Sequence, residues 1–235
     1  MSTLSSLRLG RLRRSGPALS LPVMLALAVG CERTPVKQAP RDWPAGTVLA
    51  LNGAPITQEE VDEVAGWYAL LEPQFTLPHL RRLALSNVVL PKFAARTAEP
   101  ERRRAAEADA RAALTTCRAG APPSEPAVRK SEGNWREVEV GIWAVAINTP
   151  VGSWSELIET PGCFHVARLD ELKSGRTPRD TTVVLTVLDF PYLDVTLGRQ
   201  AVDQAIDRSQ LVFVDETWRD VVPTAWQYRM RGETP

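Results

Sequence analysis

The spacing of apolar residues changes along this chain, and that change limits the folds open to it. Over residues 47–118 they recur mainly at intervals of three and four, the spacing of one helix face. Over residues 135–230 they gather in short runs rich in β-branched side chains, which favour strands. A proline-rich segment, residues 119–134, separates the two. The sequence therefore predicts an α+β chain: a helical region, a linker and a small mixed α/β domain.

The helical region is expected to begin with a short strand over 47–51 and a turn at Asn52-Gly53. Thr57 and Glu60 have the spacing of a capping box, in which each side chain accepts a backbone N–H of the other residue. A helix is expected to follow and to end at Pro73.

Two more helices are predicted in this region. One begins near Pro78, which suits a first-turn position, and Pro91 is expected to break or kink it because proline lacks a donor. The other spans 100–118 and is rich in alanine, arginine and glutamate. Its basic run over 102–104 is interpreted as a solvated helix face.

The second half is expected to form most of the strands. They are predicted over 155–160, 163–169, 182–188 and 211–214, with a helix over 194–208 and the type of 137–145 left open. The run over 182–188 is continuously apolar or β-branched, as in a strand buried on both faces.

The N-terminus has the order of a bacterial secretory signal. Arginines precede an apolar run, 21–30, that is short for a membrane-spanning helix. Ala28 and Gly30 lead into Cys31, and this resembles a lipobox, in which the cysteine is lipidated and becomes the first mature residue. The sequence predicts a signal peptide (1–30), a lipid anchor at Cys31 and a flexible tether (31–46), facing the periplasm. The alternative is an ordinary signal peptide with an incidental cysteine.

Composition excludes several functions. Basic and acidic residues both number 28, and the N-terminal 30 residues contain basic but no acidic ones, so the mature chain has no basic field for nucleic acid. No Ser-His-Asp order, phosphate-binding loop or metal-ligand spacing is present, so neither a metal nor another cofactor is expected. Cys117 and Cys163 remain after lipidation; an oxidising compartment permits a disulfide between them, and spacing alone leaves that pairing open.

Two segments resemble a known family. Residues 48–61 contain Leu-Asn-Gly-Ala-Pro-Ile-Thr, similar to the strand and turn that start the helical region of SurA/PpiC-type periplasmic chaperones. Residues 146–171 resemble the closing portion of a parvulin domain. The residues identical to that pattern are Ser155, Glu159, Thr160, His165 and Leu169. Phe164 replaces a tyrosine, and Gly162-Cys163 stand where Phe-Gly is usual.

The resemblance implies a peptidyl-prolyl cis/trans isomerase or chaperone that binds unfolded or proline-containing polypeptides. Such a site needs an apolar pocket for the proline ring and a polar cluster that favours the twisted amide. The family's cluster has two histidines, one on the first strand and one on the last, and His165 matches the second. We expect His165 to be catalytic, with Phe164, Trp154 and Leu157 contacting substrate; Trp67 is a further candidate.

The first histidine has no counterpart before the matched segment. The chain lacks the opening strand of a parvulin domain there, and its only other histidine, His79, lies in the helical region. The domain is therefore truncated, degenerate or rearranged; in the last case residues 182–188 replace the first strand in space. An active site then requires a second polar side chain beside His165. Otherwise His165 is a buried, hydrogen-bonded structural residue.

Two functions thus remain open. One is a membrane-anchored, isomerase-like folding factor whose catalysis is intact, weak or lost. The other is a structural or accessory envelope lipoprotein that uses a parvulin-like fold as an interaction module.

Overall fold

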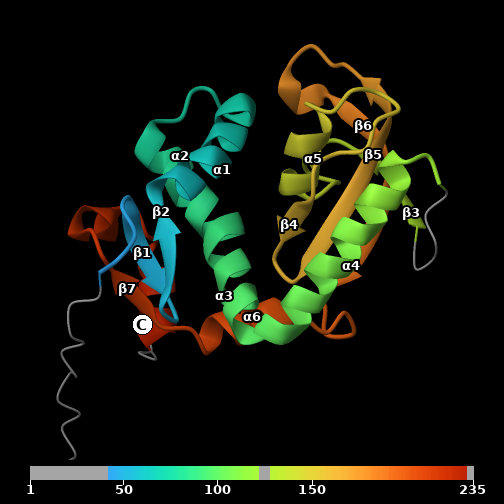
Figure 1. Cartoon of the computed structure of the whole chain (residues 1–235). Helices are drawn as coiled ribbons and strands as arrows, with labels where there is room; N and C mark the ends of the chain where they lie inside the picture. Colours follow the sequence, from blue (N-terminus) through green and yellow to red (C-terminus); the bar gives the residue numbers. More distant parts are fainter. Residues whose placement is uncertain (1–41, 122–127, 232–235) are drawn as a thin grey trace, which may run out of the picture. The chain divides into compact units, whose positions relative to one another are not determined.

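The computed structural model of the chain describes residues 42–121 and 128–231. The predicted signal peptide, the lipidation site Cys31 and most of the tether lie outside these ranges. None of the described helices is both long and apolar enough to cross a membrane. The described residues form two antiparallel sheets with helices packed on them, which confirms the α+β class (Figure 1).

The first sheet has the strand order β2-β1-β7. Its strands are β1 (Thr47–Leu51), β2 (Ala54–Thr57) and β7 (Leu211–Phe213), and β1 pairs antiparallel with both neighbours. Asn52 and Gly53 join β1 to β2 with positive φ angles of 51° and 80°, as a two-residue hairpin turn requires. The central strand β1 is buried along its whole length.

The helices of the first half cover this sheet. They are α1 (Gln58–Leu71), α2 (Leu77–Ala84), the π-helical η1 (Leu85–Val89) and α3 (Leu90–Ala98). Pro91 lies in the first turn of α3, directly after η1. The sequence predicts a break or kink here; the structure places the π-helical turn η1 directly before Pro91, and the helical path continues through it without a break.

The capping box of α1 is formed as predicted. The Thr57 hydroxyl accepts the Glu60 backbone N–H at 3.2 Å, and the Glu60 carboxylate accepts the Thr57 N–H at 3.0 Å. We expect Thr57→Ala to lower the free energy of unfolding by about 1 kcal/mol, measured by urea denaturation. Thr76→Ala is the matched control because Thr76, the N-cap of α2, makes no such side-chain bond. Equal losses for the two variants would contradict the role of the cap.

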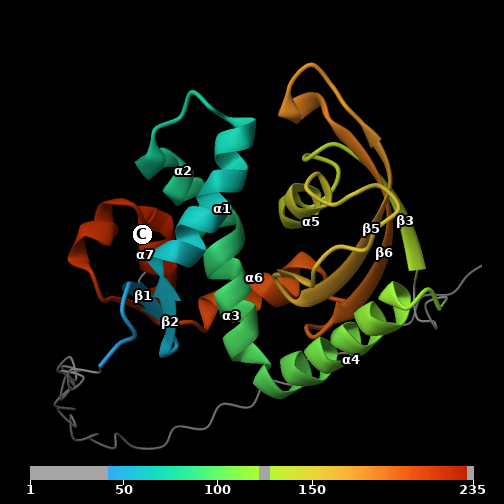
Figure 2. The ribbon, with the colours of Figure 1, turned by 45° about the horizontal axis from the view of Figure 1, so that its top comes forward.

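The second sheet has the strand order β3-β6-β5-β4. Its strands are β3 (Val128–Gly133), β4 (Ile158–Thr160), β5 (Cys163–Lys173) and β6 (Thr182–Pro191); the short 3₁₀ helix η2 (Pro178–Asp180) lies between β5 and β6. Helix α4 (Pro100–Arg118) covers one face and α5 (Val140–Ala146) the other (Figure 2). Phe164 and Val166 pack on the α4 side, and Ala167 and Leu169 on the α5 side, as strand alternation requires.

Part of the predicted linker is a strand of this sheet. Residues 128–133 form β3, which pairs with β6 over its whole length. Their sequence, Val-Arg-Lys-Ser-Glu-Gly, is polar because β3 is an edge strand whose side chains are mostly exposed. Hydrophobic alternation, the usual signal for a strand, is therefore missing.

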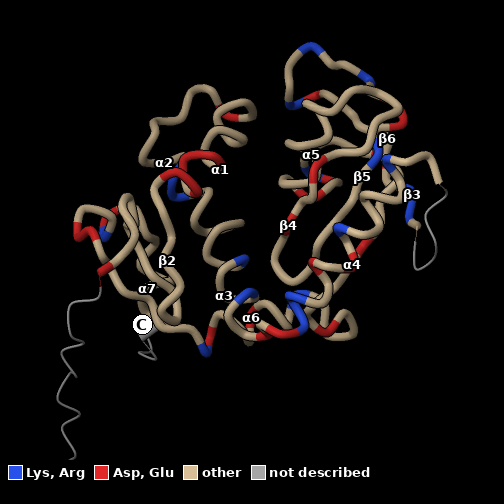
Figure 3. The backbone as a smooth tube through the Cα atoms, in the orientation of Figure 1, with Lys and Arg blue, Asp and Glu red and all other residues tan. Residues whose placement is uncertain are grey.

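The C-terminal segment returns to the first sheet, so 135–230 does not form one unit as the sequence predicts. Helix α6 (Arg199–Asp207) begins after Gly198, later than expected; β7, η3 (Glu216–Asp220) and α7 (Thr224–Arg231) follow it. Ile206, Trp218 and Val222 are buried among residues of β1 and α1–α3. Figure 3 shows residues of both charges interspersed along the described chain, although β1, β2, α5 and β7 contain none.

Candidate functional site

A row of four polar side chains crosses the second sheet, one from each strand. In spatial order they are Thr160 on β4, His165 on β5, Asp189 on β6 and Arg129 on β3. Asp189 is the direct cross-strand partner of His165, so both side chains lie on the same face, the face that α5 covers.

Hydrogen bonds join the row. His165 Nδ1 lies 2.6 Å from Asp189 Oδ1, and Nε2 lies 2.8 Å from the Thr160 hydroxyl. Arg129 Nε donates to the other oxygen of Asp189 at 2.5 Å. Because an ionised carboxylate only accepts, Nδ1 carries a proton, and in the neutral ring Nε2 accepts from Thr160. The side chain of His165 is 6% exposed, and its two hydrogen-bond partners fix the plane of the ring.

The pKa values of two carboxyl groups near the ring are shifted in opposite directions. Burial acts to raise the pKa of Asp189, but the hydrogen bonds from His165 and Arg129 outweigh it and lower the pKa. Burial raises the pKa of Glu139, and the nearby His165 only partly offsets this. The Glu139 carboxylate, at the N-cap of α5, lies 4.0 Å from His165 Nε2. The row thus holds a stable anion on one side of the ring and a more easily protonated acid on the other.

A cavity of about 790 Å³ lies beside the row. His165, Asp189 and Glu139 line it together with apolar side chains from both halves of the fold, among them Pro161, Pro191, Leu193, Val202 and Trp226. A few polar groups in a mostly apolar cavity are the usual composition of a ligand site.

Cys163 also borders this cavity, but it does not form a nucleophilic triad with His165 and Asp189. Its Sγ lies 3.9 Å from His165 Nδ1, the same nitrogen that bonds Asp189. A relay needs the nucleophile and the carboxylate on opposite nitrogens. Burial and the charge of Asp189 also raise the pKa of the Cys163 thiol to about 12, so it is protonated at neutral pH. Cys117 and Cys163 are both free thiols, so no disulfide joins them.

Asp189→Asn is expected to destabilise the fold in a pH-dependent way. A carboxyl with a lowered folded pKa contributes stability above its unfolded pKa of about 3.9, and that contribution is lost as the pH falls through the folded value. We expect a loss of about 1–3 kcal/mol at neutral pH. The difference from wild type should narrow below about pH 4, measured by urea denaturation at several pH values. A difference that stays constant into strong acid would contradict this role.

The three residues expected to contact substrate beside His165 do not lie with it. Phe164 is buried against Tyr192 on the α4 face, with a ring-centroid separation of 5.6 Å, and Leu157 and Trp154 pack into the same cluster. Strand neighbours 164 and 165 necessarily point to opposite faces. Trp67, the other aromatic candidate, packs between α1 and α5 and contacts both main cores.

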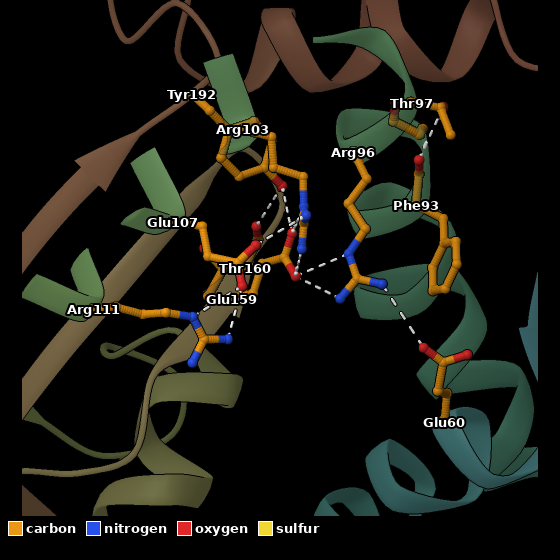
Figure 4. Close-up of polar contacts among 11 residues, drawn as sticks. Glu60, Phe93, Arg96, Thr97, Arg103, Glu107, Arg111, Glu159, Thr160 and Tyr192 are labelled. Carbon is orange, nitrogen blue, oxygen red and sulfur yellow. Dashed lines mark hydrogen bonds and ion pairs between the residues drawn. The ribbon is translucent and has the colours of Figure 1, made fainter. Parts of the chain in front are cut away.

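A second polar cluster lies on the α4 face around Glu159 (Figure 4). Glu159 Oε2 accepts from Arg96 of α3 at 2.5 Å, and Oε1 accepts from Arg103 of α4 at 2.7 Å. The Tyr192 hydroxyl donates to Glu159 at 3.3 Å. Burial acts to raise the pKa of Glu159, but the two arginines lower it overall. This cluster ties β4 to α3 and α4, so a residue of the matched motif has a structural role here.

Sequence reasoning identified His165 but missed Asp189, Arg129 and Glu139. Asp189 follows the apolar run 182–188, and a charged residue at the end of a buried strand is a signal that could have found it. Comparison of the chain with protein-family models, with curated proteins and with solved structures finds no match.

Proposed function

We propose that this chain is an exported, lipid-anchored folding factor that binds proline-containing segments of unfolded polypeptides and accelerates X–Pro isomerisation at His165. The observation that carries the proposal is the pairing of β6 beside β5 with Asp189 opposite His165. The resemblance over residues 146–171 calls for a second polar side chain at this place, where the family has a histidine. Asp189 supplies one from a strand that follows His165 in sequence.

The chemistry is rotation about an amide bond with a barrier of about 18–20 kcal/mol, and it needs no covalent intermediate. In the twisted state the amide loses its resonance, so an enzyme must bind that geometry better than the planar one. The apolar wall formed by Pro161, Pro191 and Leu193 suits a proline ring. The Glu139 carboxyl, which lines the cavity and is 46% exposed beside the buried His165, can then orient a hydrogen bond toward the rotating amide.

The cellular setting of the proposal rests on the N-terminal sequence. Cys31→Ala is expected to release a protein that stays soluble, because a lipid chain and not a membrane-spanning helix would hold the wild type. Mass spectrometry of the mature N-terminus checks this: a diacylated Cys31 is expected. An unmodified terminus, or one that begins elsewhere, would contradict the anchor.

A non-catalytic interaction module is the second candidate, and the burial of His165 favours it. A buried ring, hydrogen-bonded on both nitrogens to Asp189 and Thr160, is also typical of a structural histidine. In this case the cavity binds peptide without catalysing isomerisation, or the domain acts as an interaction module in an assembly of the cell envelope.

Two assays on the same purified protein separate these functions. A protease-coupled assay measures isomerisation of a short X–Pro peptide, and a calorimetric titration measures binding of an unfolded, proline-rich polypeptide. Acceleration above background supports the isomerase. Binding without acceleration supports a chaperone that has lost catalysis, and neither result supports the assembly module.

A further inference from the structure

Three different metal-ligating atoms converge at one point of the second sheet. Cys163 Sγ, His165 Nδ1 and Asp189 Oδ1 all lie within 4.8 Å of one another. Cys163 and His165 share a face of β5 because they are two residues apart, and Asp189 is held opposite His165 by the strand pairing. The backbone therefore brings all three side chains to the same place on one face of the sheet.

The donor distances suit a single small cation. Zinc binds thiolate sulfur at about 2.3 Å and imidazole nitrogen or carboxylate oxygen at about 2.0–2.2 Å, which places neighbouring donors about 3–4 Å apart. Here Sγ and Nδ1 are 3.9 Å apart, and Nδ1 and Oδ1 are 2.6 Å apart. A side-chain rotation of Asp189 that moves Oδ1 from 2.6 Å to about 3 Å or more from Nδ1 brings the shorter pair into that range.

Hydrogen bonds from neighbouring residues hold His165 and Asp189 in the orientation that a metal ion would need. The other ring nitrogen of His165 bonds Thr160 at 2.8 Å, which fixes the ring with Nδ1 toward Cys163. The other oxygen of Asp189 bonds Arg129 at 2.5 Å, which leaves Oδ1 on the histidine side. Hydrogen bonds of this kind orient the ligands of natural metal sites. Arg129 also adds positive charge, so its bond to Asp189 competes partly with an incoming cation.

We propose that Cys163, His165 and Asp189 form a zinc-binding site whose fourth position faces the 790 Å³ cavity. Three protein ligands and one open position are typical of zinc sites that bind water or another ligand. On binding, the Cys163 thiol releases its proton to solvent. The neutral His165 ring changes tautomer: Nδ1 loses its proton, Nε2 gains one, and Nε2–H then donates a hydrogen bond to the Thr160 hydroxyl. The thiol proton is therefore the single proton released per ion. This site shares His165 and Asp189 with the proposed isomerase site, but the zinc proposal does not require isomerase activity.

The test uses the full chain with Cys31→Ala, so that only the Cys117 and Cys163 thiols remain, after removal of metal with a chelator. Zn²⁺ is titrated by calorimetry, and Co²⁺ is used as a spectroscopic probe. We expect one ion per chain and a sulfur-to-cobalt charge-transfer band. Cys163→Ser should abolish the band and weaken Zn²⁺ binding by more than about 100-fold, beyond the loss typical of outer partners. Cys117→Ser, which replaces the buried thiol on α4, should change neither the band nor the affinity for Zn²⁺.

Asp189→Asn should weaken Zn²⁺ binding while leaving the charge-transfer band in place at saturating Co²⁺. Circular dichroism of each variant establishes that it is folded. Absence of Zn²⁺ binding to the parent chain, or an unchanged affinity in folded Cys163→Ser, would overturn the site. Isomerisation is assayed separately with chelator present, so the two proposals succeed or fail independently.

Discussion

Replacement of Glu159 by alanine is expected to lower the free energy of unfolding by about 3 kcal/mol. The Glu159 side chain is only 10% exposed and receives Arg96 and Arg103 from two different helices. Removing it leaves Arg96 with only a 3.8 Å contact to Glu60, and Arg103 with only its 3.2 Å pair to Glu107. Breaking a buried pair costs about 3–5 kcal/mol. Arg96 and Arg103 keep some access to water, which places the expected loss at the lower end.

Urea denaturation of wild type and Glu159→Ala measures this loss. Glu156→Ala is the matched control: Glu156 also pairs with an arginine, Arg118, but its side chain is 82% exposed. Surface pairs of this kind contribute about 0–1 kcal/mol. A loss below about 1 kcal/mol for Glu159→Ala, or equal losses for both variants, would mean that the cluster does not hold β4 to the helices.

Replacement of His165 by alanine is expected to lower kcat/KM for X–Pro isomerisation by about 10²-fold or more, the effect typical of losing one preorganised polar group. It should also cost about 1–3 kcal/mol of stability, because Asp189 and Thr160 lose a buried partner. The assay is therefore run at a temperature where circular dichroism shows the variant folded.

His79→Ala is the control for this variant. His79 is exposed on α2, where its ring contacts Phe75, so its loss should leave isomerisation unchanged. Wild-type rates in folded His165→Ala would remove His165 from the site. A stability loss without any wild-type activity would assign the ring a structural role alone.

The elements that depend on neighbouring residues could be predicted from the sequence. The capping box places the start of α1, and Pro100 with an alanine-rich run places α4 at 100–118. The polar edge strand β3 could not be recognised, since its side chains face solvent. The return of β7 to β1 was also missed, because a three-residue strand does not encode which distant strand it pairs with.

The same division applies to the candidate site. His165 could be found because it lies in a motif with local spacing. Its partner Asp189 could not be assigned, because the contact depends on the register between β5 and β6. The expectation that Phe164 lies beside His165 is wrong, because adjacent residues of a strand point to opposite faces of the sheet. Trp154 and Leu157 pack in the same cluster as Phe164, so they also lie on the face opposite His165.

The most direct test follows a proline-containing peptide and the protein together by NMR. Exchange spectroscopy of the peptide measures cis/trans interconversion, and amide shifts of the isotope-labelled, metal-free chain locate the bound peptide. We expect exchange peaks that grow with added protein, together with shifts at Thr160, His165, Asp189 and the cavity wall at Leu193. Unchanged exchange, or shifts confined to the α4 face around Trp154, would contradict a proline-isomerising site at His165.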